Sequence, residues 1–363
     1  KDHMPYPAST QQFPSGHTMK NRILLAPLTT TQRHEDGRLS EEEFRWLIMR
    51  AKGQFGLVMT CATHVQAVGK GFPGQLGIFG EEHLPGHQRL AREIQSYGGL
   101  AVVQLHHAGM RSPKDLIGEA PVSASDAAKY GARALSHEEI LQLRDDFIAA
   151  AVRAQKCGYD GVEVHGAHGY ILTQFLSPEI NQRTDEYGGS LENRSRIIFE
   201  IVDGIRQACG PQFLLGVRLS PERFGMRLAE AKEITQQLVD TNQVDFLDIS
   251  IWDYTKQASE EEHQGQTLLQ YFTSLDYKDV LLTVAGNIRT GADVRTVLDS
   301  GVDFVTIGRS AILHHNLPEK VLADPDFVPV TNPVSTDYLR QEGLSPNFIQ
   351  NMRRWPDFVE KGA

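Results

Sequence analysis

Residues 157–170 read CGYDGVEVHGAHGY, and this stretch contains the unit from which the fold is built. A helical pattern that begins after Ser136 ends at Cys157-Gly158, because glycine favours the end of a helix. The segment 161–165 is then a short strand, and the chain leaves it in a turn that carries His165 and His168. A helix, a short connection and a strand in this order are typical of the α/β class.

The same unit recurs on both sides of this stretch. We expect strands at 23–28, 56–60, 100–106, 161–165, 213–220, 246–250, 281–286 and 304–308. We expect helices at 41–53, 84–97, 136–157, 191–209, 228–241, 266–275 and 291–300, and a last one near Leu317. The strands are mostly continuous apolar runs, as in parallel sheets that are buried on both faces. Eight strand–helix units in about 300 residues predict a (β/α)8 TIM barrel.

The barrel leaves no room for a second domain. We expect residues 1–363 to form a single domain, with the barrel at about 20–325, an N-terminal extension before it, and a C-terminal tail from about 326 packed outside. A doubly wound open sheet is the alternative architecture. It would carry a glycine-rich phosphate loop after its first strand, where residues 26–29 read APLT.

Composition and charge exclude several classes of partner. The 363 residues carry a formal net charge of −10, which disfavours nucleic acid and other polyanions. No apolar run is long enough to span a membrane, and no signal-peptide core follows the first residues. Cys61, Cys157 and Cys209 have no metal-ligand spacing and indicate reduced thiols. We therefore expect a cytoplasmic protein that acts on a small-molecule substrate.

The carboxyl ends of the last two strands carry a candidate phosphate site. TIM barrels place their active sites at the carboxyl ends of the strands, and many bind phosphate after strands seven and eight. Gly286-Asn287 and Gly308-Arg309 lie at those two ends. Glycines allow close approach to backbone N–H groups, and arginine adds a forked cation. The alternative is that these residues only form tight turns.

His165, His168 and Tyr170 form a second candidate group, after strand four. Two imidazoles in one turn can donate hydrogen bonds to a single anionic oxygen, and a tyrosine can transfer one proton. A metal site with His106 or His107 as third ligand is an alternative, although no carboxylate partner is evident. Histidines that only satisfy buried backbone groups are another.

These residues belong to a longer stretch that resembles a known signature. Residues 161–178 and 181–196 look like the signature of the Old Yellow Enzyme family of FMN-dependent ene reductases, also called NADH:flavin oxidoreductases. Segments 21–29, 104–109, 216–220 and 308–309 resemble its first, third, fifth and eighth strands. The resemblance covers roughly residues 12–325 in order. It implies noncovalent FMN, reduction by NAD(P)H over the same flavin face, and reduction of activated alkenes.

The resemblance also implies roles for single residues. Pro27, Leu28, Thr29 and Ala62 would lie along the isoalloxazine ring, Gln104 and Arg218 would bind its pyrimidine part, and Gly286, Asn287, Gly308 and Arg309 would hold the phosphate. His165 and His168 would hold the substrate oxygen, and Tyr170 would protonate the alkene. Thr29 and Thr31 stand where one branch of the family has Cys and Tyr, and Met110 separates Gly109 from Arg111 where Gly-Arg is usual.

Two other functions remain open from the residues alone. A flavin-free isomerase or aldolase would use the phosphate site for a sugar phosphate, but it needs a lysine or glutamate at a strand end. Lys256 lies in a polar loop, and we expect Glu163 to point away from the face that carries His165. A flavin-binding sensor without turnover is the other alternative. The tail residues Arg353 and Arg354 would either pack on the surface or reach a neighbouring subunit of a homo-oligomer.

Overall fold

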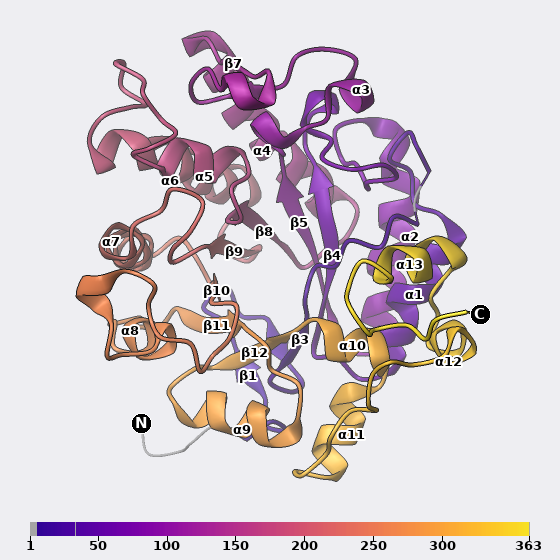
Figure 1. Ribbon diagram of the computed structural model, residues 1–363. Coiled ribbons are helices and arrows are strands. Elements are labelled where there is room, and N and C mark those ends of the chain that lie inside the picture. The colour runs from indigo at the N-terminus through magenta and orange to yellow at the C-terminus, as the bar shows by residue number, and fades with distance from the viewer. Residues whose placement is uncertain (1–5, 33, 363) are drawn as a thin grey trace.

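The computed structural model describes residues 6–32 and 34–362, and in these residues eight parallel strands close a barrel (Figure 1). The strands are β3 (Ile23–Leu25), β4 (Leu57–His64), β5 (Leu100–His106), β8 (Gly161–Gly166), β9 (Leu214–Leu219), β10 (Phe246–Ser250), β11 (Leu281–Ala285) and β12 (Phe304–Ile307). Each strand pairs with its sequence neighbours, and β12 closes the barrel against β3. The predicted TIM barrel is confirmed.

Helices surround the barrel. The longer ones are α1 (Glu41–Lys52), α2 (Leu84–Ser96), α4 (His137–Lys156), α6 (Leu191–Cys209), α7 (Leu228–Asp240) and α9 (Gly291–Asp299). Shorter ones are α3 (Lys114–Ile117), α5 (Ile171–Leu176), α8 (Leu268–Thr273), α10 (Arg309–Leu313), α11 (Leu317–Ala323), α12 (Thr336–Gln341) and α13 (Pro346–Met352). Ser136 caps α4 in the predicted capping box with Glu139. None of the helices described here is both long and apolar enough to cross a bilayer.

Strand β4 is longer than predicted. It continues to His64, so Cys61 and Ala62 lie within the strand and not after it. The pairing of β4 with β5 shifts between Met59 and Ala62, an irregularity of the kind made by a β-bulge. Hydroxyl groups mark this part of the strand, and Thr60 Oγ1 accepts a hydrogen bond from the backbone N–H of Gln104 (3.2 Å). The polar residues here end the apolar pattern without ending the strand.

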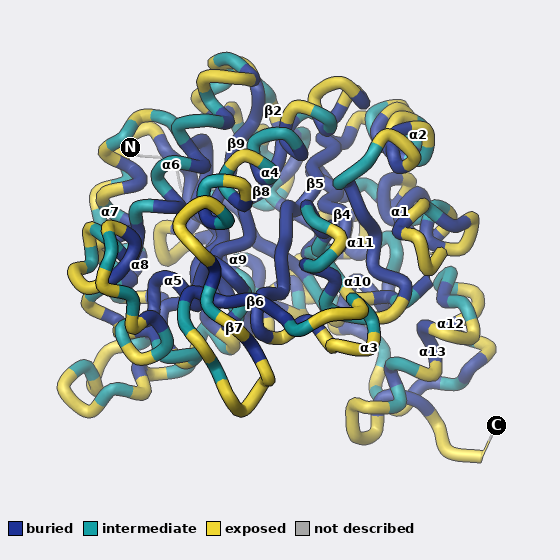
Figure 2. The backbone as a smooth tube through the Cα atoms, turned by 90° about the horizontal axis from the view of Figure 1, so that it is seen from above, coloured by how far each residue is buried: buried dark blue, intermediate teal, exposed yellow. Residues whose placement is uncertain are grey.

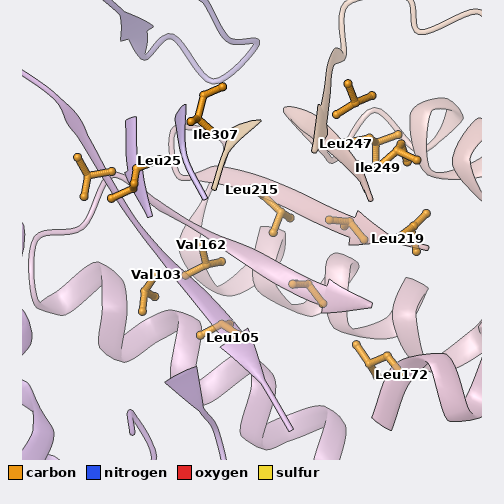
Figure 3. Packing of buried hydrophobic residues seen from close by; sticks show 14 of the residues in the cluster. Leu25, Val103, Leu105, Val162, Leu172, Leu215, Leu219, Leu247, Ile249 and Ile307 are labelled. Atoms are coloured by element: carbon orange, nitrogen blue, oxygen red, sulfur yellow. The ribbon is translucent and has the colours of Figure 1, made fainter. Parts of the chain in front are cut away.

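Apolar side chains on the outer face of the strands form the main core against the helices (Figure 3). Val103 and Leu105 on β5, Val162 on β8 and Leu215 on β9 are fully buried in this layer. Figure 2, turned by 90° from Figure 1, shows buried residues running through the strands in the middle of the molecule and exposed residues gathering at the periphery. Burial of both strand faces explains why the strands are continuous apolar runs in the sequence.

A separate apolar cluster fills the amino-terminal end of the barrel interior. Strands β1 (Gln11–Gln12) and β2 (Thr18–Met19) form a hairpin, and Phe13 between them lies against Phe246 and Phe304. The three ring centroids are 5.7–5.8 Å apart, and all three rings are buried. The N-terminal extension therefore closes one end of the barrel, and a ligand can enter only from the other end.

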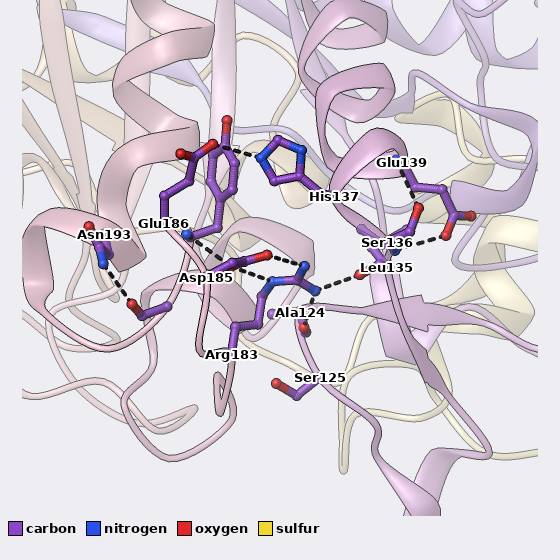
Figure 4. A network of polar contacts seen from close by, with 12 residues as sticks. Ala124, Ser125, Leu135, Ser136, His137, Glu139, Arg183, Asp185, Glu186 and Asn193 are labelled. Atoms are coloured by element: carbon purple, nitrogen blue, oxygen red, sulfur yellow. Dashed lines mark hydrogen bonds and ion pairs between the residues drawn. The ribbon is translucent and has the colours of Figure 1, made fainter.

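The second half of the signature, residues 181–196, builds scaffold (Figure 4). Arg183 donates hydrogen bonds to the carbonyl oxygens of Ala124 and Leu135 and forms an ion pair with Asp185 (2.6 Å). Two short strands, β6 (Val122–Ser123) and β7 (Arg133–Ala134), lie in the segment that Arg183 holds. These contacts fix the long connection between α5 and α6 to the segment that precedes α4.

The C-terminal tail packs on the outside of the barrel, as predicted. Arg50 of α1 is fully buried and donates hydrogen bonds to the carbonyl oxygens of Ala311, Ile312 and Glu342. Burial lowers the pKa of Arg50 to about 9. One side chain therefore ties α1 to α10 and to the tail, and it sets the position of the chain directly after β12.

The Phe13 contact gives a test of how the barrel end is closed. Phe13→Ala should lower the free energy of unfolding by about 3–5 kcal/mol, because a buried ring leaves a cavity between two other rings. Phe13→Leu fills most of this space and should cost less than about 1.5 kcal/mol. Denaturant unfolding of both variants measures the difference. Equal losses in the two variants would show that the ring does not plug the barrel.

Candidate active site

A cavity of about 740 Å³ opens at the carboxyl ends of the strands, a size within the range of cofactor and substrate pockets. Its walls come from loops after β3, β5, β8, β9, β10, β11 and β12 and from the C-terminal tail. The charged side chains that line it are Arg111, Arg218, Arg289, Arg309 and Asp253. Four arginines against one aspartate, in a chain of net charge −10, indicate an anionic ligand.

One end of the cavity is suited to a phosphate group. Gly286 and Asn287 follow β11, Gly308 and Arg309 follow β12, and all four line the cavity as the sequence predicts. A side chain on Gly286 would clash with Ile251, at 2.7 Å from its Cγ1. A Cβ on Gly308 would meet only Leu28, at 3.8 Å, so the space above this backbone is free for a ligand. Ser310 adds a buried hydroxyl oxygen without a hydrogen-bond partner among the described residues.

Two residues outside the predicted phosphate site also contribute to this end of the cavity. Arg289 lies near Arg309, and burial together with the charge of Arg289 lowers the pKa of Arg309. Two neighbouring guanidinium groups repel each other unless an anion lies between them. Trp355 of the tail stacks on Arg309, whose Cζ is 3.9 Å from the ring centroid. Arg289 could have been found by its position three residues after Gly286, whereas Trp355 carries no local signal.

The other end of the cavity contains a cluster of rings. His168 and Tyr170 line the cavity, and His165 lies next to them, with ring centroids 5.1 and 5.2 Å away. The ring of His106 is 4.4 Å from that of Tyr170. Arg111 places its guanidinium 4.3 Å from the centre of the Tyr170 ring and donates to the carbonyl oxygen of His168. The Tyr170 hydroxyl makes no hydrogen bond to another described residue.

Hydrogen bonds set the orientation of both histidines. The N–H of Ala167 donates to Nδ1 of His165 (3.2 Å), so the neutral ring carries its proton on Nε2. His168 is held by Ser250, whose Oγ is 2.7 Å from its Nε2, and its backbone has a positive φ of 61°. The left-handed backbone turns the ring toward the cavity at a conformational cost that glycine would avoid.

Burial is the main cause that lowers the pKa of His165 and of His168 well below the usual range, and the charges of Arg218 and Arg111 lower both further. Both rings are therefore neutral at physiological pH, and each can donate one N–H. The nitrogens of His106, His165 and His168 do not meet as three metal ligands within 4.8 Å in the described residues. The cluster has the geometry of a hydrogen-bonding site.

A polar layer lies in the barrel interior beneath the cavity. Gln104 is buried and donates from Nε2 to Oε1 of Glu163 (2.7 Å). Arg218 lines the cavity with its Nε 3.7 Å from Oδ2 of Asp248. The expectation that Glu163 points away from His165 is wrong. The two residues are two positions apart on β8, and residues at that spacing share a face of a strand.

Three of the predicted cofactor-binding residues do not line the cavity. Pro27 and Leu28 line it, but Thr29 is exposed outside it and accepts a hydrogen bond on its carbonyl oxygen from Asn351 of α13 (3.3 Å). Ala62 and Gln104 lie deeper, in β4 and β5. Trp252, which the sequence places after the sixth strand, forms an aromatic wall together with Phe224, which the sequence analysis did not single out. Lys256 Nζ forms an ion pair with Glu222 Oε1 (2.5 Å). The lysine considered for an aldolase is therefore already bound to a carboxylate.

The family model described as the NADH:flavin oxidoreductase / NADH oxidase family matches residues 13–324. The chain belongs to this family. The match spans the whole barrel, from the hairpin with Phe13 to the end of α11. The resemblance to the Old Yellow Enzyme family, and with it the class of FMN-dependent NAD(P)H oxidoreductases, is confirmed.

Individual relatives agree with this family. The chain is 37% identical over 320 residues to the probable NADH-dependent flavin oxidoreductase YqiG of Bacillus subtilis, covering 85% of this chain and 86% of that protein. An Old Yellow Enzyme homologue from Zymomonas mobilis superposes with a TM-score of 0.79 at 28% identity, over 92% of this chain and 96% of that one. 2-Naphthoyl-CoA reductase, solved with 2-naphthoyl-CoA, gives a TM-score of 0.80 at 27% identity, over 87% of this chain and 52% of that longer one.

The buried histidines predict how stability depends on pH. Burial lowers the pKa of His64 and His87 to about 4 and of His107 to about 3, and it lowers those of His106, His165 and His168 as well. Below pH 6.5 the unfolded chain binds protons that the folded chain does not. The contribution of these histidines to the free energy of unfolding is therefore full above pH 6.5, and below it the contribution falls by up to about 1.4 kcal/mol per pH unit for each such histidine.

His107→Gln isolates one of these groups. The variant should show a shallower fall in the free energy of unfolding between pH 7 and pH 5, whatever its stability at pH 7. Denaturant titrations at several pH values measure the slope. The same substitution at the exposed His34 is the control. An unchanged slope in His107→Gln would mean that His107 titrates alike in the folded and unfolded chain.

Proposed function

We propose that this protein is an FMN-dependent ene reductase, which takes a hydride from NAD(P)H and reduces an activated alkene. The observation that carries the proposal is that one cavity joins an anion-binding end to a cluster of neutral hydrogen-bond donors. The first end suits the phosphate of a cofactor, and the second suits a carbonyl or nitro oxygen. The alternatives fit less well, because none of the described residues that line the cavity is a lysine, which an aldolase would need, and a sensor would need no proton donor.

The residues present fit FMN. The phosphate would lie between the turns at Gly286-Asn287 and Gly308-Arg309, where Arg309, Arg289 and the unpartnered Ser310 hydroxyl supply donors. Pro27 and Leu28 would lie along the ring system. Arg218, whose buried Nε has no hydrogen-bond partner among described residues, and Gln104 would bind the pyrimidine part. Bound there, FMN would supply the hydride-transfer chemistry between NAD(P)H and the alkene.

The chain's own residues would hold the substrate and supply its proton. His165 and His168 would donate hydrogen bonds to the substrate oxygen, which draws electron density from the alkene. Because both rings are neutral, they would stabilise negative charge on that oxygen without protonating it. Tyr170 would hold its hydroxyl proton for the carbon next to the activating group. Phe224 and Trp252 would pack against the substrate and exclude water.

Flavin content tests the cofactor proposal. The purified protein should be yellow, with one FMN per chain. Arg309→Ala should weaken FMN binding by about 1.5–3 kcal/mol, because the phosphate loses a charge-assisted hydrogen bond. Arg295→Ala is the matched control, since Arg295 is exposed and pairs with Asp326 far from the cavity. Titration of apoprotein with FMN measures both. A colourless protein that binds no added FMN would refute the proposal.

Tyr170→Phe tests proton transfer separately from hydride transfer. The variant keeps the ring and its contact with Arg111 and removes only the hydroxyl, so flavin content and the rate of reduction by NAD(P)H should change by no more than a few-fold. Oxidation of the reduced protein by 2-cyclohexenone should slow by about 10²–10⁴. Oxidation by a quinone, which needs no proton on carbon, should be almost unaffected. Stopped-flow spectroscopy measures all three rates.

Comparison of the two oxidants shows in which way the role proposed for Tyr170 would be wrong. Equal slowing with 2-cyclohexenone and quinone would make Tyr170 a binding residue. No slowing with either would assign the proton to water or to another side chain.

A further inference from the structure

Two carboxyl groups face each other in the barrel interior, in the polar layer beneath the cavity. Glu163 on β8 and Asp248 on β10 are fully buried, and the two carboxyl groups are close enough for Asp248 to contribute to the raised pKa of Glu163. The strand between them, β9, has Gly216 paired with Glu163 and Arg218 paired with Asp248. The ring of Phe246 fills the space above Gly216, and the guanidinium of Arg218 is the cation that acts on both carboxyls.

A hydrogen bond between these groups would require a proton. Two carboxylates have no donor, so one of the pair would have to be a carboxylic acid. Glu163 Oε1 already accepts from Gln104, and no described N–H or hydroxyl donates to Glu163 Oε2 or to either oxygen of Asp248. Burial raises the pKa of both groups, and it raises that of Glu163 well above its usual value. The larger rise at Glu163 favours Glu163 as the group that holds a proton, with Oε2 as its donor and the charge on Asp248.

We propose that Glu163 and Asp248 share one proton and act as positioning residues for the pyrimidine end of the flavin. The inference rests on the FMN-dependent function proposed above. Through Oε1, Glu163 fixes the Nε2 side of the Gln104 amide, which leaves the Gln104 Oε1 free as an acceptor for an N–H of the ring. The single charge of the pair balances Arg218, which would otherwise act alone on the ring.

The balance of charge has a consequence for the reduction potential. Negative charge collects on the pyrimidine part of a flavin when it is reduced, and Arg218 stabilises that charge. A carboxylate 3.7 Å from Arg218 Nε, on a fully buried Asp248, opposes this stabilisation. The pair therefore keeps the reduction potential lower than Arg218 by itself would set it, which makes the reduced flavin a stronger hydride donor.

Amide variants test the shared proton, because the effects of the two substitutions on the flavin's reduction potential should not add. In Glu163→Gln, Asp248 keeps the charge. In Asp248→Asn, the freed Glu163 ionises against Arg218 and takes the charge over. Each single variant should therefore shift the equilibrium between the protein's flavin and a reference dye by less than about threefold. The double variant removes the charge, and it should shift this equilibrium at least tenfold toward reduced flavin, which is about 30 mV for a two-electron couple.

Two outcomes of the reduction-potential measurements would contradict the proposal. Additive shifts, with each single variant contributing half of the change, would mean that both groups are ionised. No shift in the double variant would mean that the pair carries no charge that acts on the flavin. If the wild-type protein binds no FMN, the proposed function fails instead, and the potentials cannot be measured in any variant.

The apoprotein provides a test that needs no flavin. The pKa of Glu163 is higher in the folded chain, so its contribution to stability is full below the unfolded value of about 4.5 and is lost as the pH rises toward the folded value. The charged groups that face it are Asp248 and Arg218, while Gln104 and Thr283 of the neighbouring strands are neutral. At pH 8, unfolding should release about one proton more from wild-type apoprotein than from Glu163→Gln.

Calorimetry in buffers of different ionisation enthalpy counts these protons. Equal proton release from the two apoproteins would show that the folded pair holds no proton and would overturn the proposal. The number of released protons comes from how the unfolding enthalpy depends on the ionisation enthalpy of the buffer, and not from the stability of the protein. A variant that is merely less stable therefore still gives a valid answer.

Discussion

Closure of the parallel barrel is the constraint on which the rest of this structure depends. Closure makes every second residue of each strand face a common interior, so the inward side chains of eight strands must fill one column. The amino-terminal end of this column is filled by Phe13, Phe246 and Phe304. Two residues beyond Phe246, β10 carries Asp248, and the neighbouring strands β8 and β9 carry Glu163 and Arg218. The interior thus changes from apolar to polar within one layer, and the cavity lies above the polar layer.

Charge in this protein is distributed unevenly, and burial gives the distribution its chemical effect. The chain is acidic as a whole, yet its cavity is lined by arginines at both ends and in the middle. These cations, together with desolvation, keep the neighbouring histidines neutral. The same loss of water raises the pKa of the carboxyls beneath Arg218. A site that collects negative charge during a reaction needs donors that stay in place and do not titrate, and this arrangement provides them.

Much of the family signature serves the scaffold. The first half, through Tyr170, supplies the ring cluster, but Arg183 and Asp185 in the second half hold one long connection against another (Figure 4). Arg50 has the same function on the opposite side, where it joins α1, α10 and the tail. Trp355 completes the cavity from a segment about 46 positions beyond Arg309, the residue on which it stacks. The walls of the site are therefore as much a product of the connections as of the strands.

The sequence by itself determined the strand–helix rhythm, the order of the units and the positions of the strand ends, because periodicity and glycine placement are local properties. It therefore also predicted that Gly286, Gly308, Arg309, His168 and Tyr170 lie around one opening. Only the tertiary structure decided which strand residues meet across the barrel. The pairing of Glu163 with Asp248, the contact of Gln104 with Glu163 and the stacking of Trp355 on Arg309 join segments far apart in the chain. Such contacts depend on strand register and on the path of the tail, and neither leaves a pattern in the residues next to them.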